Sequence, residues 1–268
     1  MSFSISGKTA IVTGAANGVG LAIARHFLDV GANVMFADMD EERLSDEAGG
    51  DREEGSARYF VGDLRQRLTT ANLLSATIDA FDRVDILVNA SRQVLPSDPL
   101  NIEDTSVETM FEQNVVASLR LSQLVGNRMI KQSKGRPEDE PVGSIVNLSS
   151  IAADRTHAKL LAYSIGSAAL NQMTRSLAVA MAQHRIRVNA LAIGSVMSES
   201  LKKRLKDGGS DLRNDIINST PLGRIAPASE VAEAAQFLAS DGAAFMTGEV
   251  ITLDGGRTLL DSVAHSAH

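Results

Sequence analysis

Short apolar runs alternate along this chain with longer stretches of helical periodicity, and that alternation restricts the folds it can adopt. Seven runs rich in β-branched residues have the predominantly apolar character of strands covered on both faces of a parallel sheet. They span residues 9–13, 33–37, 57–61, 84–89, 144–148, 187–192 and 249–253. Helical periods occupy residues 19–30, 68–81, 106–131, 162–183 and 229–240. The pattern predicts an α/β fold with a single doubly wound parallel sheet, flanked by helices on both faces.

The composition suits one globular domain over residues 1–268, with 44% hydrophobic and 22% charged residues. There are 33 acidic and 26 basic residues, and the net charge of −7 argues against nucleic acid as a partner. The chain has no cysteine and its five histidines lack metal-ligand spacing, so we expect neither disulfides nor a metal site. It has no apolar run long enough to span a membrane and no basic leader. We therefore expect no membrane association and a cytoplasmic location.

Three segments stand apart from the strand–helix alternation. Residues 132–141 are charged and punctuated by glycine and proline, which predicts a surface loop. Residues 206–221 mix two glycines with apolar positions and predict a second irregular stretch. We interpret residues 195–221 as a flap over a substrate site, with a solvated connector as the alternative. Residues 259–268 form the expected C-terminal tail.

A glycine-rich turn over residues 13–20 joins the first predicted strand to the first predicted helix. Its glycines would let the backbone approach a pyrophosphate at the helix N-terminus, although small residues also serve close helix–strand packing. Asp38 lies directly after the second predicted strand, where a carboxylate can bind both adenosine ribose hydroxyls and repel a 2′-phosphate. The glycine turn and Asp38 together predict NAD rather than NADP as cofactor. The alternative role of Asp38 is a strand-end carboxylate at the start of the next helix.

Further motifs follow in a fixed order along the chain. Tyr163 stands thirteen residues after Ser150, which lies two residues beyond the fifth predicted strand. The other motifs are Gly62-Asp63-Leu64, Val88-Asn89-Ala90-Ser91, Asn114, residues 189–194, residues 221–224 and residues 253–256. Together with the glycine turn, they resemble the short-chain dehydrogenase/reductase family over essentially the whole chain. The resemblance implies a Rossmann-type fold.

The resemblance also implies an active site with three catalytic residues. Tyr163 would act as acid and base, Ser150 would polarise the reacting oxygen, and Asn114 would hold a water for proton relay. The implied cofactor-binding residues are Gly14, Asn17, Gly18, Val19, Gly20, Asp38, Met39, Asp63, Leu64, Asn89, Ala90, Ser91, Tyr163, Gly194 and Val196. A homodimer or homotetramer is implied as well, because the helix after Tyr163 packs against its two-fold mate in the family.

One departure from the family bears on function. The family places a lysine four residues after the tyrosine, one turn along the same helical face, and this chain has Ser167 there. By resemblance, that lysine holds the nicotinamide ribose and lowers the pKa of the tyrosine. A tyrosine with an ordinary pKa of about 10 is a poor base at neutral pH. The resemblance therefore implies a weakened or altered site.

Several candidates also have simpler interpretations. Lys159 could reach Tyr163 from the preceding loop, but a solvated surface lysine is the simpler interpretation. His157 could contact the substrate as a further acid or base, but a polar surface histidine is the simpler interpretation. Ser150 could merely cap the segment after its strand, and Asn114 could merely satisfy backbone groups of the neighbouring strand. Two further departures, Ser91 for glycine and Ile193 for proline, fall near the same pocket, and Ala169 stands where an enoyl reductase would carry lysine.

The leading hypothesis is an NAD(H)-dependent oxidoreductase that interconverts a secondary alcohol and a ketone. The alternative is a catalytically impaired NAD(H)-binding oligomer that serves as a sensor or interaction protein. Steroid, sugar, acyl thioester and small alcohol all stay open as substrate classes. The stripe of Leu170, Met173, Leu177 and Met181 is expected to be buried against the core or another subunit.

Overall fold

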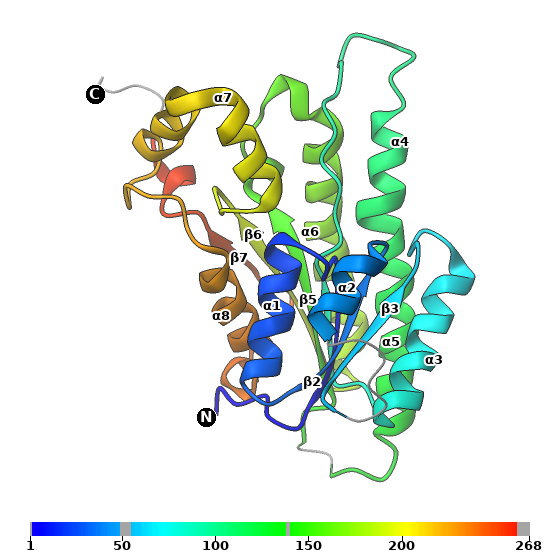
Figure 1. The fold of residues 1–268 in the computed structure, drawn as a ribbon. Coiled ribbons are helices and arrows are strands. Elements are labelled where there is room, and N and C mark those ends of the chain that lie inside the picture. The colour runs from blue at the N-terminus through cyan, green and yellow to red at the C-terminus, as the bar shows by residue number, and fades with distance from the viewer. Residues whose placement is uncertain (1, 49–54, 138–139, 262–268) are drawn as a thin grey trace.

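The computed structural model describes residues 2–48, 55–137 and 140–261, and its centre is one sheet of seven strands (Figure 1). The strands lie in the order β3-β2-β1-β4-β5-β6-β7 and pair in parallel throughout. They are β1 (Thr9–Thr13), β2 (Asn33–Asp38), β3 (Ala57–Val61), β4 (Ile86–Asn89), β5 (Gly143–Ser150), β6 (Ile186–Ile193) and β7 (Val250–Leu253). The predicted doubly wound parallel sheet is confirmed.

Helices cover both faces of the sheet (Figure 1). On one face, α1 (Gly18–Asp29) packs against α8 (Ala228–Ala239), and both contribute to one core cluster. On the other face lie α3 (Arg67–Phe81), α5 (Ala117–Gln132) and α6 (Leu161–Ala182). Successive side chains of β1 alternate between the two clusters, Val12 joining the first and Ile11 the second. Burial on both sides explains why the strands read as apolar runs.

The chain changes direction across the sheet between the neighbouring strands β1 and β4. In open sheets of this kind, the loops after two such strands diverge and leave a crevice at their carboxyl ends. The turn after β1 and the loop after β4 therefore flank the place where a ligand site is expected.

The helix predicted over residues 106–131 is divided in three. It comprises α4 (Ser106–Phe111), the π-helical turn η1 (Glu112–Val116) and α5. A π turn adds one residue without interrupting the apolar pattern, so periodicity does not reveal it, and such turns are frequent at functional sites. Asn114 lies in the middle of this one.

The expectation of an irregular stretch over residues 206–221 is wrong for most of its length. Helix α7 runs over Glu199–Asn218, and the Oγ of Ser198 caps it by accepting a hydrogen bond from the N–H of Leu201 at 3.2 Å. Two interior glycines cost a helix about 1 kcal/mol each relative to alanine, which here is not enough to end it. Most of the segment proposed as a flap is therefore this helix.

The remaining elements include α2 (Glu41–Ala48) and a short 3-10 turn, η5 (Arg257–Leu259), at the start of the expected tail. Residues 262–268 of that tail lie outside the described residues. No helix in the described ranges is long and apolar enough to cross a membrane. Within the same ranges, no group of three or more histidine, aspartate or glutamate side chains is placed to hold a metal ion.

Candidate functional site

The turn between β1 and α1 requires glycine at three places. Gly14 and Gly18 have φ angles of +67° and +59°, in the left-handed region that other residues rarely adopt. A Cβ atom on Gly20 would lie 2.1 Å from the carbonyl oxygen of Gly14. Gly20 therefore serves the close packing of the helix on the turn, whereas Gly14 and Gly18 set the path of the backbone.

Asp38 is tied directly to this turn. Its Oδ2 accepts a hydrogen bond from the N–H of Ala16 at 3.1 Å, and its Oδ1 accepts one from the N–H of Met39 at 2.7 Å. Asp40 accepts a hydrogen bond from the N–H of Arg43 at 3.2 Å and so caps helix α2. The carboxylate of Asp38 thus lies beside the glycine turn, as the spacing predicted.

A groove of about 280 Å³ runs along the turn and the loop after β4. Many of the predicted cofactor-binding residues line it: Gly14, Asn17, Gly18, Val19, Gly20, Asp38, Ala90 and Ser91. Arg92, Val94 and Ser198 complete the lining. The fold therefore brings residues from four separate segments to the crevice at the carboxyl end of the sheet.

Tyr163 lies in the first turn of α6 and is only 8% exposed. A second, small cavity adjoins it, and Ser91 and Arg92 line both this cavity and the groove. The hydroxyl oxygen of Tyr163 accepts a hydrogen bond from Nη1 of Arg92 at 3.0 Å. The groove therefore leads to the Tyr163 hydroxyl through the Ser91–Arg92 segment.

Ser167 lines the same small cavity but makes a different contact. Its Oγ donates a hydrogen bond to the backbone carbonyl of Tyr163 at 2.8 Å. This is a bond along one helical turn, of the kind that serine often makes inside helices. Ser167 therefore acts on the backbone of α6 rather than on the tyrosine hydroxyl.

Ser150 ends β5 and is buried. Its Oγ accepts a hydrogen bond from the N–H of Ala152 at 3.1 Å and caps the 3-10 turn η2 (Ile151–Ala153). The capping role considered from the sequence is thus present. Within the described ranges no group accepts the hydroxyl hydrogen of Ser150, so the residue can cap the turn and still donate to a reacting oxygen.

The side-chain amide of Asn114 both accepts and donates a hydrogen bond with the backbone. Its Oδ1 accepts from the N–H of Gln93 at 2.8 Å, and its Nδ2 donates to the carbonyl of Gln93 at 2.9 Å. Asn114 thereby holds the loop after β4, a structural role like the one considered from the sequence, except that its backbone partner lies in the loop and not in the strand. Its role as the holder of a relay water stays a prediction.

The other predicted site residues are more dispersed. Asn89 lines the small cavity, and its buried amide donates to Ser122 at 3.0 Å and to Asn147 at 2.8 Å. Like Ser150, five of these residues lie outside the lining of both cavities: Met39, Asp63, Leu64, Gly194 and Val196. Among them, Asp63 pairs with Arg65 at 2.7 Å, and the hydrogen bonds from Arg65 hold the pKa of this carboxyl below its usual range. Their contact with a cofactor stays a prediction.

Arg92 is the site residue that the sequence did not reveal. It directly follows Ser91, but no helical spacing links it to Tyr163. Lys159, the cation that the sequence suggested near Tyr163, is exposed. His157 is also exposed, and its Nδ1 accepts a hydrogen bond from the N–H of Lys159 at 3.3 Å. The simpler surface interpretation of both residues agrees with the structure.

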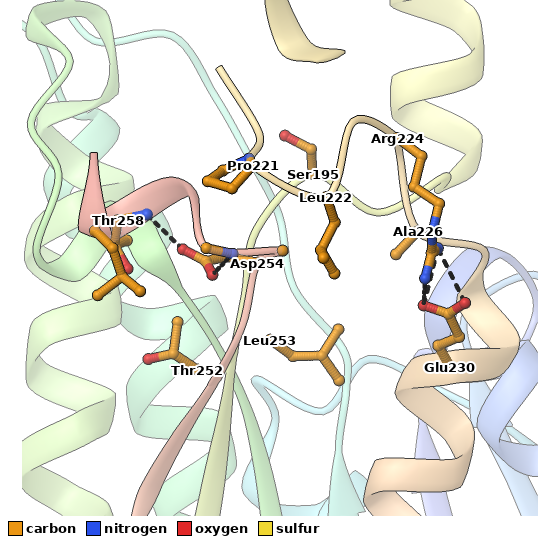
Figure 2. A pocket seen from close by; sticks show the side chains of 13 residues that line it. Ser195, Pro221, Leu222, Arg224, Ala226, Glu230, Thr252, Leu253, Asp254 and Thr258 are labelled. Atoms are coloured by element: carbon orange, nitrogen blue, oxygen red, sulfur yellow. Dashed lines mark hydrogen bonds and ion pairs between the residues drawn. The ribbon is translucent and has the colours of Figure 1, made fainter. Parts of the chain in front are cut away.

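A further cavity, with a volume of about 630 Å³, lies elsewhere among the described residues. Figure 2 shows Leu222 and Leu253 between the Asp254 carboxylate on one side and the Arg224–Glu230 ion pair, at 3.0 Å, on the other. None of its lining residues lines the groove or the cavity beside Tyr163. This cavity is therefore separate from the candidate active site, despite its volume.

Comparison with known proteins agrees with this geometry. Residues 14–258 match the family model described as "Enoyl-(Acyl carrier protein) reductase". The chain is 33% identical to oxidoreductase UcpA of Salmonella typhimurium strain LT2, over 97% of this chain and 98% of that protein. It is 31% identical to short chain dehydrogenase/reductase astE of Aspergillus oryzae, over 96% of this chain and 97% of that protein.

A solved structure of similar fold is that of 7α-hydroxysteroid dehydrogenase complexed with NADH and 7-oxo glycochenodeoxycholic acid. The two share 27% sequence identity with a TM-score of 0.84, over 95% of each chain. Both the sequence matches and the fold therefore extend over nearly the whole molecule. This chain belongs to the short-chain dehydrogenase/reductase family of oxidoreductases.

Proposed function

We propose that this protein is an NAD(H)-dependent oxidoreductase that interconverts a secondary alcohol and a ketone. The observation that carries the proposal is the position of the Tyr163 hydroxyl. It lies at a cavity that adjoins the groove formed by the glycine turn and Asp38. A proton-transferring group next to a groove suited to a dinucleotide is the arrangement that hydride transfer requires.

The residues of the groove fit a dinucleotide. Gly14 and Gly18 shape the backbone at the start of α1, and a helix N-terminus favours a pyrophosphate through its N–H groups and its dipole. The Asp38 carboxylate would accept hydrogen bonds from a ribose diol and would repel a 2′-phosphate. No basic side chain follows Asp38 directly in the sequence, so we propose NAD rather than NADP.

A bound nicotinamide would supply the hydride acceptor in alcohol oxidation and the hydride donor in ketone reduction. In oxidation, the oxygen of Tyr163 takes the proton of the alcohol, and in reduction it returns that proton to the carbonyl oxygen. The Ser150 hydroxyl donates a hydrogen bond to the same substrate oxygen. These two groups come from α6 and the end of β5.

We propose further that the site is altered relative to the family pattern, because Ser167 stands where the family carries lysine. Ser167 bonds to the helix backbone and carries no charge. This same observation favours a second candidate, a catalytically impaired NAD(H)-binding oligomer that acts as a sensor or interaction protein. The two candidates differ in turnover rather than in cofactor binding.

A panel of secondary alcohols incubated with NAD⁺ and the protein separates the candidates. We expect at least one alcohol to be oxidised, with the appearance of NADH measured by its absorbance. Tyr163→Phe should lower that rate by about a hundredfold or more, since general acid–base catalysis contributes at least that much. Tyr59→Phe, a matched change on β3, should leave the rate unchanged. NADH binding without turnover of any alcohol would instead support the non-catalytic candidate.

A further inference from the structure

We propose that Arg92 provides the positive charge beside Tyr163 that residue 167 does not provide. Arg92 acts through the tyrosine and is therefore a positioning residue. This inference rests on the proposed function, because it assigns Arg92 a part in the acid–base work of Tyr163. It starts from the contact between Nη1 of Arg92 and the hydroxyl oxygen of Tyr163, at 3.0 Å.

The direction of this hydrogen bond matters for the chemistry. The guanidinium donates and the tyrosine oxygen accepts, so the phenolic proton stays free to move to and from a substrate. A guanidinium stays charged over the whole working pH range, whereas a serine hydroxyl has no charge. A cation at hydrogen-bond distance favours the phenolate over the neutral phenol. Arg92 thus makes Tyr163 a better base.

The loop that carries Arg92 is fixed on both sides of that residue. Before it, the N–H groups of Ala90 and Ser91 both donate to Oγ1 of Thr13, each at 3.0 Å. After it, Asn114 binds both backbone groups of Gln93. These anchors come from β1 and from the π turn, two separate elements. The backbone of Arg92 is therefore held in place before any ligand binds, which is the preorganisation that a functional site needs.

The other charged or titratable groups on the elements around α6 are exposed or have partners elsewhere. Glu112 on the π turn pairs with Arg120 at 2.6 Å, and Arg187 on β6 donates to the carbonyls of Leu238 and Ser240. The exposed ones are Glu108, Asp154, Arg155, His157 and Lys159. Within the described ranges, Arg92 is the charged side chain that contacts the Tyr163 hydroxyl.

The two tyrosines of this chain, Tyr59 and Tyr163, allow a test that needs no substrate or cofactor. The chain has no tryptophan, so phenolate absorbance in the near ultraviolet follows tyrosine ionisation directly. In a Tyr59→Phe background, the alkaline rise in this absorbance comes from Tyr163. The rise should be absent when Tyr163→Phe is added, which confirms the assignment.

In that background, Arg92→Gln should move the midpoint of the absorbance rise upward by about one to three pH units. In Arg92→Lys the midpoint should stay close to its original pH, because this variant retains the charge. Arg92→Met keeps the length and the apolar stem and replaces Arg92→Gln if that variant does not fold. Arg25→Gln, which removes an exposed arginine that pairs with Glu47, is the matched control and should not move the midpoint.

Equal midpoints in the neutral and cationic variants would overturn the inference, even in an enzyme that oxidises alcohols. A shifted midpoint in a protein that oxidises no alcohol would support the role of Arg92 while the proposed function fails. In an active enzyme, Arg92→Gln should also shift the rise of kcat to higher pH. In Arg92→Lys, which retains the charge, kcat should rise near the same pH as in the unmodified enzyme. A purely structural role would lower the rate without moving that pH profile.

Discussion

Asp38 shows how a single residue can serve both the fold and a ligand. One carboxylate oxygen of Asp38 binds the N–H of Ala16 in the glycine turn, and the side chain also lines the groove. Removing the side chain would therefore change both the shape of the turn and the charge that a ribose would meet. Two substitutions separate these effects.

We expect NADH to bind at least ten times more tightly than NADPH, a difference of about 1.4 kcal/mol. Asp38→Asn should narrow the difference while keeping an acceptor for the N–H of Ala16, because the repulsion of a 2′-phosphate needs the charge. Asp38→Ala should narrow the difference in affinity and weaken the binding of both cofactors. Titration calorimetry measures each affinity, and Asp79→Asn, an exposed carboxylate on α3, is the control. Equal affinities for the two cofactors in the unmodified protein would contradict the choice of NAD.

The site residues differ in how far the sequence revealed them. The glycine turn and Asp38 are local motifs, so spacing along one strand–helix–strand unit was enough to place them beside each other. Arg92 and Tyr163 come from a loop and a helix that meet only in the folded molecule. Helical spacing predicts that the residue four positions along α6, Ser167, lies near Tyr163. It gives no information about Arg92, which lies in a distant loop.

Among the elements, the segment after β7 is held by one carboxylate. Asp254 accepts hydrogen bonds from the N–H of Gly256 at 2.8 Å and of Thr258 at 2.7 Å. Burial raises the pKa of Asp254, but the bonds from Thr258 and Gly256 and the charge of Arg257 outweigh it and leave that pKa below its usual range. The ionised carboxylate therefore stabilises this turn.

This arrangement predicts a pH-dependent effect on stability. Because the pKa of Asp254 is lower in the folded state than its unfolded value of about 3.9, its contribution is present above that value and is lost as the pH falls through the folded pKa. Asp254→Asn should lower the free energy of unfolding by about 1 kcal/mol at neutral pH, since the group is partly exposed. The difference should shrink below about pH 4. Urea unfolding at both pH values measures it, and a difference that does not change with pH would contradict this account.

The elements also show where periodicity stops being informative. The strands were predicted to within two residues at each end, because burial on both faces makes the central ones predominantly apolar. The π turn at η1 was missed, since one extra residue leaves the apolar pattern of α4 and α5 intact. Helix α7 was mistaken for an irregular stretch because its glycines lower helix propensity, although Ser198, which caps it, is a residue type that often begins helices.

At the scale of the whole molecule, α6 presents two different apolar faces. Leu170 and Met181 of the predicted stripe are buried, and Met181 joins the core cluster together with Leu177. This part of the prediction is confirmed. Leu161, Ile165 and Val179 lie on the opposite face and are exposed, Val179 to 81%. That face is the better candidate for contact with another subunit.

We expect light scattering at micromolar concentration to show a homodimer or homotetramer. Val179→Arg should shift the protein toward smaller species, because it places a charge within an apolar contact. Leu68→Gln, a change at an exposed apolar residue on α3, should leave the mass unchanged. A monomer at these concentrations would refute the expectation of an oligomer.

The contact between Arg92 and Tyr163 joins residues 71 positions apart. A charged partner one turn away on the same helix would sit beside the tyrosine whenever that helix is formed. Here the contact between Arg92 and the Tyr163 hydroxyl exists only while the loop after β4 is packed on α6. Activity would then report tertiary assembly rather than helix content. In rising denaturant we expect turnover to disappear as soon as this docking opens, while the helical signal of the molecule is still intact.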